Sequence, residues 1–555
     1  MDSHPFRFLR SLGRSREIAT VLLKHGFGDL VERLHLQRYL QWGRRVIFWR
    51  KAEPGASHTR AERIRLALEN LGATFIKFGQ VISTRPDLVP ADVIRELSRL
   101  QEHVPAFASD LATAVIQEEL GRPVSALFAE FDPVPIAAGS LGQVHRARHF
   151  DGTLLAVKIR RPNVVRDVER DLSLMFELAL LIERHIPEAQ VFDPVGLVNQ
   201  FARTIRRELN FMREGRTIQE FARLFRHDAT LRVPRVYSDL TSEAVLTMEF
   251  IDGYRVDDSA SLIDNRICPR EVAANGARIF LKQTFEFGFF HGDPHPGNIR
   301  ILPDGSICLL DYGMVGVLED ERREQLVDLF LAVSRQDVGA AVHTILTIGE
   351  PRRAIDLPLL RADVRDFVEN HYGVALDRLN VAAMLSDFVS ILSNHGIQCP
   401  ADIMLLIRAL VTLEGVGRDL DPGFNLAEYL APCIENIVRQ RYDPQRIAGR
   451  VLQETRTFLR LAHDVPLYLG RSLEKLSKDD LRVQFQHTGL DHFITEIDRS
   501  SNRVVIGLVM SSLIVASALV IRSSTASLLF SIPLFALWSL LGIWLIYGVF
   551  RSGRL

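Results

Sequence analysis

The residues best suited to chemistry lie in one stretch, Phe290–Gly313. It reads Phe-His-Gly-Asp-Pro-His-Pro-Gly-Asn, continues through a short apolar run and ends in Leu-Leu-Asp-Tyr-Gly. Asp293 is placed in a turn, where its carboxylate can accept a proton from an attacking hydroxyl or water, or orient it. Asn298 and Asp311 supply the hard oxygen atoms that Mg²⁺ prefers. The spacing is typical of the catalytic loop and the Asp-Phe-Gly segment of kinases, with Tyr312 replacing phenylalanine.

A hairpin is predicted between the two metal-binding candidates, from strand Ile299–Leu302 through the turn Pro303–Gly305 to strand Ile307–Leu310. Such a hairpin brings Asn298 and Asp311 to the same end, where they can converge on one ion. The plain alternative for a lone Gly-Asp pair is a turn former. The combination of His-x-Asp, the following asparagine and a later Asp-x-Gly favours a phosphoryl-transfer site.

A phosphate-binding hairpin is predicted upstream of this stretch. Gly139, Gly142 and Val144 fit the last three fixed positions of Gly-x-Gly-x-x-Gly-x-Val, and Ala137 replaces the first glycine. Small residues there let backbone N–H groups approach nucleotide phosphates closely. A lysine then ends a Val/Ala/Leu run, as does the strand lysine of kinases that pairs with the α- and β-phosphates. The alternative is a tight hairpin without a ligand; the candidates are Ala137, Ala138, Gly139, Ser140, Gly142, Val144 and Lys158.

Two lysines need carboxylate partners if they are buried. Lys77 and Gln80 lie on a mostly apolar predicted helix, where a lysine ordinarily extends its charged end to water. The sharper interpretation is that Lys77 points into a site. Glu208 and Glu214 lie on one predicted helix downstream, and either of them can pair with Lys158 or with Lys77. The choice stays open from spacing alone.

A short strand, Leu246–Gly253, is predicted to end at the place where a kinase hinge would join two lobes. Its Glu249 is therefore a nucleotide-binding candidate. A long helix is predicted before it, at Val164–Ile186. Residues 321–500 read as helices rich in leucine and valine, with Glu414 and Arg418 spaced for an i,i+4 ion pair.

Composition bounds the function only loosely. The chain has 555 residues, enough for several domains, and its formal net charge of −1 gives no support for nucleic-acid binding. The four cysteines are far apart with no Cys-x-x-Cys spacing, which argues against a zinc site and a disulfide framework and suits a reducing compartment. No secretory signal pattern precedes the helical part.

Both ends of the chain suggest contact with a membrane. Residues 1–60 form a basic region with apolar and aromatic residues at helical spacing, which is typical either of a segment on an anionic surface or of an amphipathic helix packed on its own domain. Val504–Ile521 and Leu528–Phe550 carry no charge and are separated by a short turn, which predicts a transmembrane hairpin. The flanking arginines place both of its ends, and the catalytic part, on the cytoplasmic side. The expected location is the bacterial inner (cytoplasmic) membrane, with more than one span.

Taken together, the motifs resemble those of the ABC1/ADCK/UbiB family of atypical kinases over roughly residues 60–430. They are Lys77-Phe-Gly-Gln80, Ala137-Ala-Gly-Ser140, Leu155-Ala-Val-Lys158, Glu208-Leu-Asn-Phe-x-x-Glu214, His291-Gly-Asp-Pro-His-Pro-Gly-Asn298 and Asp311-Tyr-Gly313. The C-terminal pair of spans resembles that of the bacterial members that support ubiquinone biosynthesis. Two departures from the family pattern are Gly139, where many members have alanine, and Asn210, where aspartate is usual.

The resemblance implies an α+β, protein-kinase-like, two-lobed and mostly helical fold. A helical extension carrying Lys77 and Gln80 would fold over the site and gate it, and so obstruct peptide substrates. It implies ATP (or ADP) and Mg²⁺ as ligands, with Asp293 orienting the nucleophile and Asn298 and Asp311 holding the metal. The implied partners are membrane lipids, ubiquinone-biosynthesis enzymes and, as an open alternative, quinone precursors; no nucleic acid is expected, and an oligomer is left open.

The expected organisation has five parts: the basic region 1–60, the helical extension 61–134, the kinase core 135–320 with its first lobe ending near 253, the accessory helices 321–500 and the membrane hairpin 501–555. The expected activity is that of an atypical kinase or ATPase coupled to lipid or partner handling. Two rivals stay open. One is a small-molecule phosphotransferase, because antibiotic and choline kinases share His-Gly-Asp-x-x-x-x-Asn; the other is a nucleotide-binding scaffold without turnover.

Overall fold

The computed structural model describes residues 12–34, 58–83, 85, 89, 91–100, 105–186, 193–351, 354–371 and 381–441, with scattered helical positions between 501 and 516 and at 540. The chain divides into two units, Met1–Ile447 and Ala448–Leu555. The elements that position the site all belong to the first unit.

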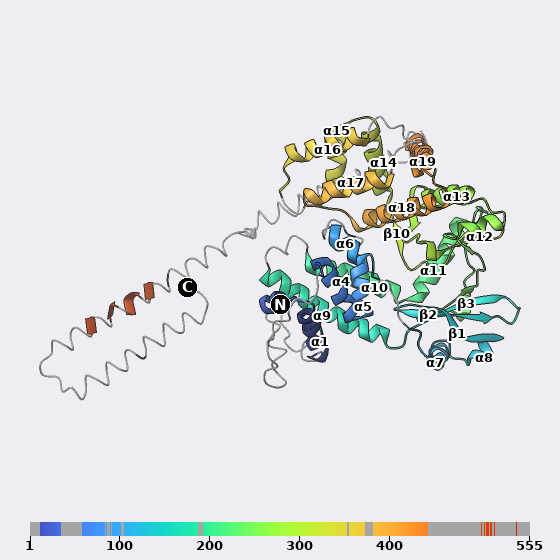
Figure 1. Ribbon diagram of the computed structural model, residues 1–555, viewed down its shortest axis with the longest axis horizontal. Helices are drawn as coiled ribbons and strands as arrows, with labels where there is room; N and C mark the ends of the chain where they lie inside the picture. The colour runs from blue at the N-terminus through green and yellow to red at the C-terminus, as the bar shows by residue number, and fades with distance from the viewer. Residues whose placement is uncertain are drawn as a thin grey trace, which may run out of the picture. The chain divides into compact units, whose positions relative to one another are not determined.

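A four-stranded antiparallel sheet forms the first lobe, in the order β1-β2-β3-β5. Its strands are β1 (Glu130–Ala138), β2 (Gly142–Arg148), β3 (Leu154–Arg160) and β5 (Val245–Glu249), and α7 (Ser109–Leu120) and α8 (Val124–Leu127) lie beside it (Figure 1). Side chains alternate between the faces of a strand. Leu155, Val157 and Ile159 of β3 are therefore buried together with Ile116 of α7, while Lys158 lies on the other face.

Three helices connect the sheet to the rest of the site: α9 (Val164–His185), α10 (Pro194–Glu208) and α11 (Phe211–Leu224). The expected single helix containing both glutamates was wrong, because the chain breaks after Glu208. Asn210 caps the new helix, with its Oδ1 accepting a hydrogen bond from the Arg213 backbone N–H at 3.2 Å. Asparagine and aspartate are both good N-caps, so this position does not require the aspartate usual in related sequences.

The N-terminal part is helical: α1 (Leu12–Lys24), α2 (Gly28–Arg33), α4 (Arg60–Leu71), α5 (Ala73–Ser83) and α6 (Ala91–Leu97). Helix α1 buries Ile18 in a cluster with α4, α5, α9 and α10, and Arg14 pairs with Asp171 of α9 at 3.0 Å. Of the two interpretations of the basic region, these contacts favour the amphipathic helix packed on its own domain. Residues 1–11 and 35–57 of that region lie outside the described residues.

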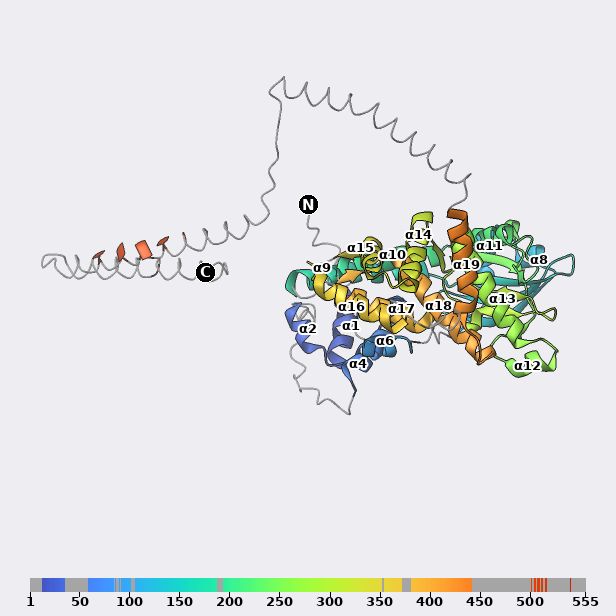
Figure 2. The ribbon, with the colours of Figure 1, turned by 90° about the horizontal axis from the view of Figure 1, so that it is seen from above.

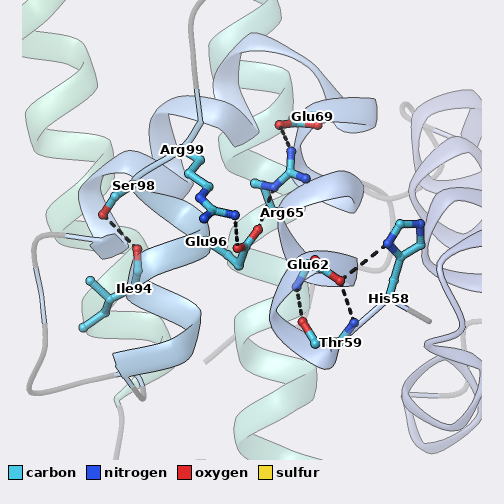
Figure 3. A network of polar contacts seen from close by, with 9 residues as sticks. All are labelled: His58, Thr59, Glu62, Arg65, Glu69, Ile94, Glu96, Ser98 and Arg99. Carbon is cyan, nitrogen blue, oxygen red and sulfur yellow. Dashed lines mark hydrogen bonds and ion pairs between the residues drawn. The ribbon is translucent and has the colours of Figure 1, made fainter.

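Helices α4 and α6 are joined by a polar network (Figure 3). Arg65 of α4 contacts Glu69 at 2.6 Å and Glu96 of α6 at 3.0 Å, and Arg99 also contacts Glu96, at 2.6 Å. The start of α4 is fixed by a capping box, in which Thr59 and Glu62 exchange hydrogen bonds. This network fixes the two helices between which α5 is packed.

The segment with the predicted catalytic residues, residues 289–317, is called the catalytic stretch and follows α12 (Ser259–Asp264), α13 (Pro269–Leu281) and a π-helical turn (Lys282–Phe287). It begins with β7 (Phe289–His291), forms the hairpin β8 (Ile299–Ile301) and β9 (Ile307–Leu309), and ends with β10 (Val315–Val317). The predicted hairpin is confirmed, with Gly305 at φ +81° in its turn. Strands β4 (Leu231–Arg232) and β6 (Tyr254–Arg255) extend this hairpin to a four-stranded sheet.

Strand β10 pairs with β7, so that Val315 lies opposite His291. This pairing brings the two ends of the catalytic stretch together. The content of the first unit, a small antiparallel sheet followed by a mostly helical second part, agrees with the expected α+β, kinase-like fold.

Up to residue 441, the catalytic stretch is followed by α14 (Asp320–Ser334), α15 (Val338–Ile348), α16 (Leu357–His371), α17 (Val381–Asn394), α18 (Ala401–Leu420) and α19 (Leu426–Arg441). Each packs on the next from α14 to α18 (Figure 2), and α18 also packs on α13 and β10. The predicted Glu414–Arg418 pair is confirmed at 2.5 Å.

The expected multi-pass location in the bacterial inner membrane is contradicted by the described part of the chain. No helix within the described ranges is both long enough and apolar enough to cross a bilayer. The longest, α9, has 22 residues but carries charges along its length, from Arg166 and Asp167 to Arg184. Nine positions of the expected span Val504–Ile521 and one position of Leu528–Phe550 are described, all of them helical, and the other positions of both spans lie outside the described residues.

Candidate active site

One cavity of about 300 Å³ collects most of the predicted site residues. Its walls come from the β1–β2 hairpin, β3, α5, the α10–α11 junction and the catalytic stretch. The lining residues are Lys77, Ala137, Ala138, Gly139, Ser140, Leu141, Gly142, Gln143, Val144, Lys158, Glu208, Phe211, Glu214, His291, Asp293, Asn298, Asp311, Gly313 and Met314. Of the fifteen predicted residues, only Gln80 and Glu249 are not part of this wall.

Lys158 and Glu214 form the central ion pair. The Lys158 Nζ donates to both carboxylate oxygens of Glu214, at 2.9 and 2.8 Å, and lies 3.7 Å from Oδ2 of Asp311. Burial alone lowers the pKa of Lys158, but the carboxylates of Asp311 and Glu214 outweigh it and raise that pKa above its ordinary value. The lysine therefore stays charged, as a phosphate ligand must.

The two carboxylates around Lys158 are held in different states. The charge of Lys158 lowers the pKa of Asp311 to about 2. Burial raises the pKa of Glu214 to about 7, although Lys158 opposes the shift. Asp311 is thus the permanent anion at this end of the cavity, as a metal ligand requires.

The other predicted pairing is equally specific. Lys77 of α5 lies 3.4 Å from Oε2 of Glu208, the last residue of α10. The alternatives left open by spacing are therefore resolved, with Lys77 beside Glu208 and Lys158 beside Glu214. Lys77 is turned into the cavity rather than into water.

The other members of the Lys-x-Gly-Gln motif position this helix. A Cβ atom on Gly79 would lie 2.4 Å from Leu100 and 2.8 Å from Leu68, so only glycine lets α5 pack this closely on its neighbours. Gln80 does not reach the cavity; its side-chain amide donates to the Leu100 carbonyl at 3.0 Å. The motif thus combines one lysine facing the site with two residues that fix its helix.

Buried His291 ties the two halves of the catalytic stretch together. Its Nδ1 accepts a hydrogen bond from the Asp293 backbone N–H at 3.2 Å, and its Nε2 bonds to the Asp311 carbonyl oxygen. A neutral ring with its proton on Nε2 satisfies both contacts. Burial lowers the pKa of His291, in keeping with the neutral form. Gln283, in the π-helical turn, accepts from the His291 backbone N–H at 2.9 Å and so fixes β7.

Asp293 and Asn298 are held in one turn. The Asn298 side-chain N–H donates to the Asp293 carbonyl at 3.2 Å. The amide oxygen of Asn298 is thereby left as the acceptor, in the same wall as the Asp311 carboxylate. These two oxygen donors fit Mg²⁺, which binds few protein ligands and takes the remainder from phosphate and water. In the described part of the chain no group of three or more His, Cys, Asp or Glu side chains could hold a metal unaided.

In the predicted phosphate-binding hairpin, the backbone of the β1–β2 turn approaches the backbone of β3 closely. The Gly139 N–H donates to the Gly142 carbonyl at 2.8 Å, which closes the turn between β1 and β2. A Cβ on Gly142 would lie 2.5 Å from the Ile159 carbonyl oxygen of β3. Arg161 also donates to the Gly139 carbonyl at 3.2 Å and holds the loop from the far end of β3.

Glu249 is directed elsewhere. Its carboxylate pairs with Arg232 at 2.8 Å and accepts from the Arg235 backbone N–H at 3.2 Å. Its position at the end of β5 agrees with the expected hinge, but its side chain serves β4 and the following loop rather than the cavity.

Sequence reasoning missed Arg408 of α18, whose Nη2 donates to Oδ1 of Asp293 at 3.2 Å. The available signal was a single charge within the apolar run Ile403–Val411. It also missed the role of Gln283, for which a polar residue after the apolar helix α13 gives no specific pattern.

The arrangement as a whole offers the chemical groups that phosphate binding and phosphoryl transfer need. Lys158 provides a fixed positive charge, Asn298 and Asp311 provide metal-binding oxygens, and Asp293 provides a carboxylate beside them. These are the components that a kinase-type phosphoryl-transfer site requires.

Three family models match the chain. They are an ABC1 atypical kinase-like domain at residues 99–345, a UbiB helical domain at 364–425 and an ABC1/UbiB kinase-like C-terminal domain at 488–551. The cavity is built mainly from the first of these, and α18 comes from the second.

Similar proteins span nearly the whole chain. An uncharacterized protein of Synechocystis is 33% identical over 87% of this chain and 84% of its own length. A Xanthomonas campestris protein named "Probable protein kinase UbiB" is 31% identical over 92% of this chain and 93% of its own length. A solved structure of a Mycobacterium tuberculosis protein in complex with erythromycin matches with a TM-score of 0.45 and 21% identity, over 62% of this chain and 87% of the other.

Proposed function

The chain belongs to the ABC1/UbiB family of atypical kinase-like proteins, and from that premise we propose that it binds Mg²⁺·ATP and cleaves or transfers the terminal phosphoryl group in support of ubiquinone biosynthesis. The observation that carries the proposal is that Lys158, Asp293, Asn298 and Asp311 line one cavity. They come from β3, from the turn at residues 292–298 (the catalytic turn) and from the segment after β9. Their convergence in one cavity is what a kinase-type site requires.

Each residue has a role that its surroundings support. Lys158, kept charged by two carboxylates, would hold the α- and β-phosphates of the nucleotide. Asn298 and Asp311 would hold Mg²⁺, which neutralises phosphate charge when it is bound. Asp293 would accept a hydrogen bond from the attacking hydroxyl or water and orient it toward the phosphorus atom.

The wall contributed by α5 favours a small acceptor. Lys77 lies in the cavity together with Glu208, and Gly79 and Gln80 fix the helix that carries it. An extended peptide would have to share this space with α5. Hydrolysis, or transfer to a small molecule, is therefore favoured over phosphorylation of a protein. Quinone precursors and the enzymes of that pathway stay predicted partners.

The direct test measures nucleotide binding and phosphate release on the full-length protein. A fluorescent ADP analogue with Mg²⁺ should bind the wild type and Asp293→Asn alike, whereas phosphate release should fall by about 10²-fold or more in Asp293→Asn, the range for loss of a general base. In parallel, a deletion strain complemented with either form should recover its quinone content only with the wild type.

The outcomes separate the rival functions. Binding without phosphate release in the wild type would favour the nucleotide-binding scaffold. Release only after addition of a soluble hydroxyl compound would favour the small-molecule phosphotransferase. Absence of nucleotide binding would overturn the proposal.

A further inference from the structure

Arg408 lies at the junction between the helical domain and the catalytic turn. It belongs to α18, 115 residues after Asp293, and its Nη2 lies 3.2 Å from the Asp293 Oδ1. The two side chains are 36% and 30% exposed, so water reaches both. Ion pairs this exposed contribute little to stability. A contribution to folding alone is therefore a weak explanation for this contact.

Asp293 is held in two different ways. Its backbone is fixed locally: its N–H donates to His291, and its carbonyl accepts from Asn298 and from the His295 N–H at 2.7 Å. Its carboxylate has one hydrogen-bond partner in the described part of the chain, Arg408. The backbone of the turn therefore does not decide the direction of the carboxylate. Arg408, a residue of the helical domain, sets the direction of the carboxylate.

The packing of α18 places Arg408 at this point. Leu405 lies one helical turn before it on the same face, and a Cβ on Gly292 would be 2.9 Å from the Leu405 methyl groups. The glycine of His-Gly-Asp thus lets α18 approach the turn closely. Ile407 and Ala409, on either side of Arg408, are buried. The helix is therefore fixed in the core, while the Arg408 side chain extends to Asp293.

The shape of the site restricts what Arg408 can do. Among the described residues that line the cavity, Asp293 is present and Arg408 is not. Arg408 therefore contacts the carboxylate from outside the cavity. With Oδ1 held by arginine, Oδ2 is the oxygen left to accept a hydrogen bond from a nucleophile. A guanidinium has a rigid fork of donors, which suits this holding role.

We propose that Arg408 is a positioning residue for Asp293, through which the helical domain sets the rate of phosphoryl transfer. The inference rests on the proposed function, since it assigns Arg408 to the same site. It predicts a loss in kcat rather than in nucleotide affinity, because Lys158, Asn298 and Asp311 are left in place. A misplaced catalytic group commonly costs about 10²-fold in rate, and we expect a loss of about 10- to 100-fold for Arg408→Ala.

The experiment compares steady-state phosphate release from Mg²⁺·ATP in the full-length wild type, Arg408→Ala, Arg408→Lys and Arg408→Gln. Arg439→Ala is the matched control, since this arginine of α19 is exposed and lies 4.0 Å from Glu435. Thermal unfolding and affinity for a fluorescent ADP analogue are measured for each variant. The expected result is a lower kcat for Arg408→Ala and Arg408→Gln, partial rescue in Arg408→Lys, and KM and ADP affinity within about twofold of the wild type, as for a group that acts only on the chemical step.

A double-mutant cycle separates positioning from general damage to the fold. In the Asp293→Asn background, the change from Arg408 to alanine should alter kcat by less than about twofold, because the group it positions has been replaced. Where Asp293→Asn is too slow to measure, or where Arg408→Ala does not fold, the kcat of Arg408→Lys is compared with the kcat of Arg408→Gln. A higher kcat for Arg408→Lys supports the positioning role.

Two results would overturn the inference. One is a wild type that releases phosphate and an Arg408→Gln variant with the same kcat, which would leave the proposed function intact. The other is a loss of kcat on Arg408→Ala that is equally large in the wild-type background and in the Asp293→Asn background. A wild type without any phosphate release would instead refute the proposed hydrolysis, and with it the rate-setting role of Arg408.

Discussion

Replacing Tyr312 by phenylalanine should stabilise the protein. Tyr312 is 1% exposed, and its ring packs against Phe221 of α11 and against His291 at centroid distances of 5.0 and 5.7 Å. Its hydroxyl is buried and has no hydrogen-bond partner within the described residues. Burial raises the pKa of Tyr312 well above its ordinary value, so the group stays neutral and still requires an acceptor.

The magnitude follows from the cost of burying an unsatisfied polar group, about 1–3 kcal/mol. Phenylalanine removes that cost and keeps both ring contacts, but it leaves a void the size of one oxygen atom, which offsets part of the gain. We expect a net stabilisation of about 1 kcal/mol, or roughly 2–4 °C in Tm for a domain of 150–250 residues.

The assay is thermal unfolding of the full-length protein, with the affinity for a fluorescent ADP analogue as a check on the site. Tyr254→Phe is the matched control, because the Tyr254 hydroxyl donates to Asn265 at 2.8 Å and its loss should leave Tm unchanged or lower. A fall in Tm for Tyr312→Phe would refute the reasoning, since it would mean that the buried hydroxyl has a partner such as an ordered water molecule.

Three other changes test the site. Gly292→Ala should destabilise the protein by about 1–3 kcal/mol through overlap with Leu405, and thermal unfolding should show recovery when Leu405→Ala is added; no recovery would contradict the packing argument. Asp311→Asn should abolish Mg²⁺-dependent nucleotide binding by calorimetry, whereas unaltered binding would contradict the metal assignment. Because the pKa of Glu214 is about 7, lowering the pH through this value protonates Glu214, which then no longer accepts both of the hydrogen bonds that hold Lys158 in position. ADP binding should therefore weaken, by up to about tenfold per pH unit. Glu214→Gln should remove this part of the pH dependence, and a pH profile of the variant equal to that of the wild type would contradict the assignment.

Local spacing predicted the centre of the site well. The hairpin between Asn298 and Asp311 is encoded by a turn signal and two short apolar runs, and the small residues at Gly139 and Gly142 mark a close approach of backbone. These features depend on residues near each other in the chain. For this reason the sequence alone was enough to identify them.

Contacts between distant segments were harder to predict. The choice of Glu208 for Lys77 and of Glu214 for Lys158 depends on the helix break at Asn210, which turns the two glutamates in different directions. Arg408 reaches the site through the packing of a helix from another domain. No spacing rule connects positions so far apart.

Membership of a motif also did not imply that a residue lines the cavity. Gln80 belongs to a recognisable motif yet donates to the Leu100 carbonyl in the segment after α6, and Glu249 ends a hinge strand yet pairs with Arg232. Both residues stabilise the structure through contacts that are visible only in the three-dimensional arrangement. A motif identifies residues that act together, and the three-dimensional structure then distinguishes those that face the cavity.

The pairing of β7 with β10 has a consequence for how this family can vary in length. The two strands close the catalytic stretch at its base, with Asp293 and Asp311 next to that closure and the turn around Gly305 at the opposite tip. An insertion or deletion at the tip lengthens or shortens the β-hairpin without altering the separation of the two carboxylates. A change in loop length therefore disturbs the site least at Gly305, and a reporter peptide for the purified protein is best inserted there.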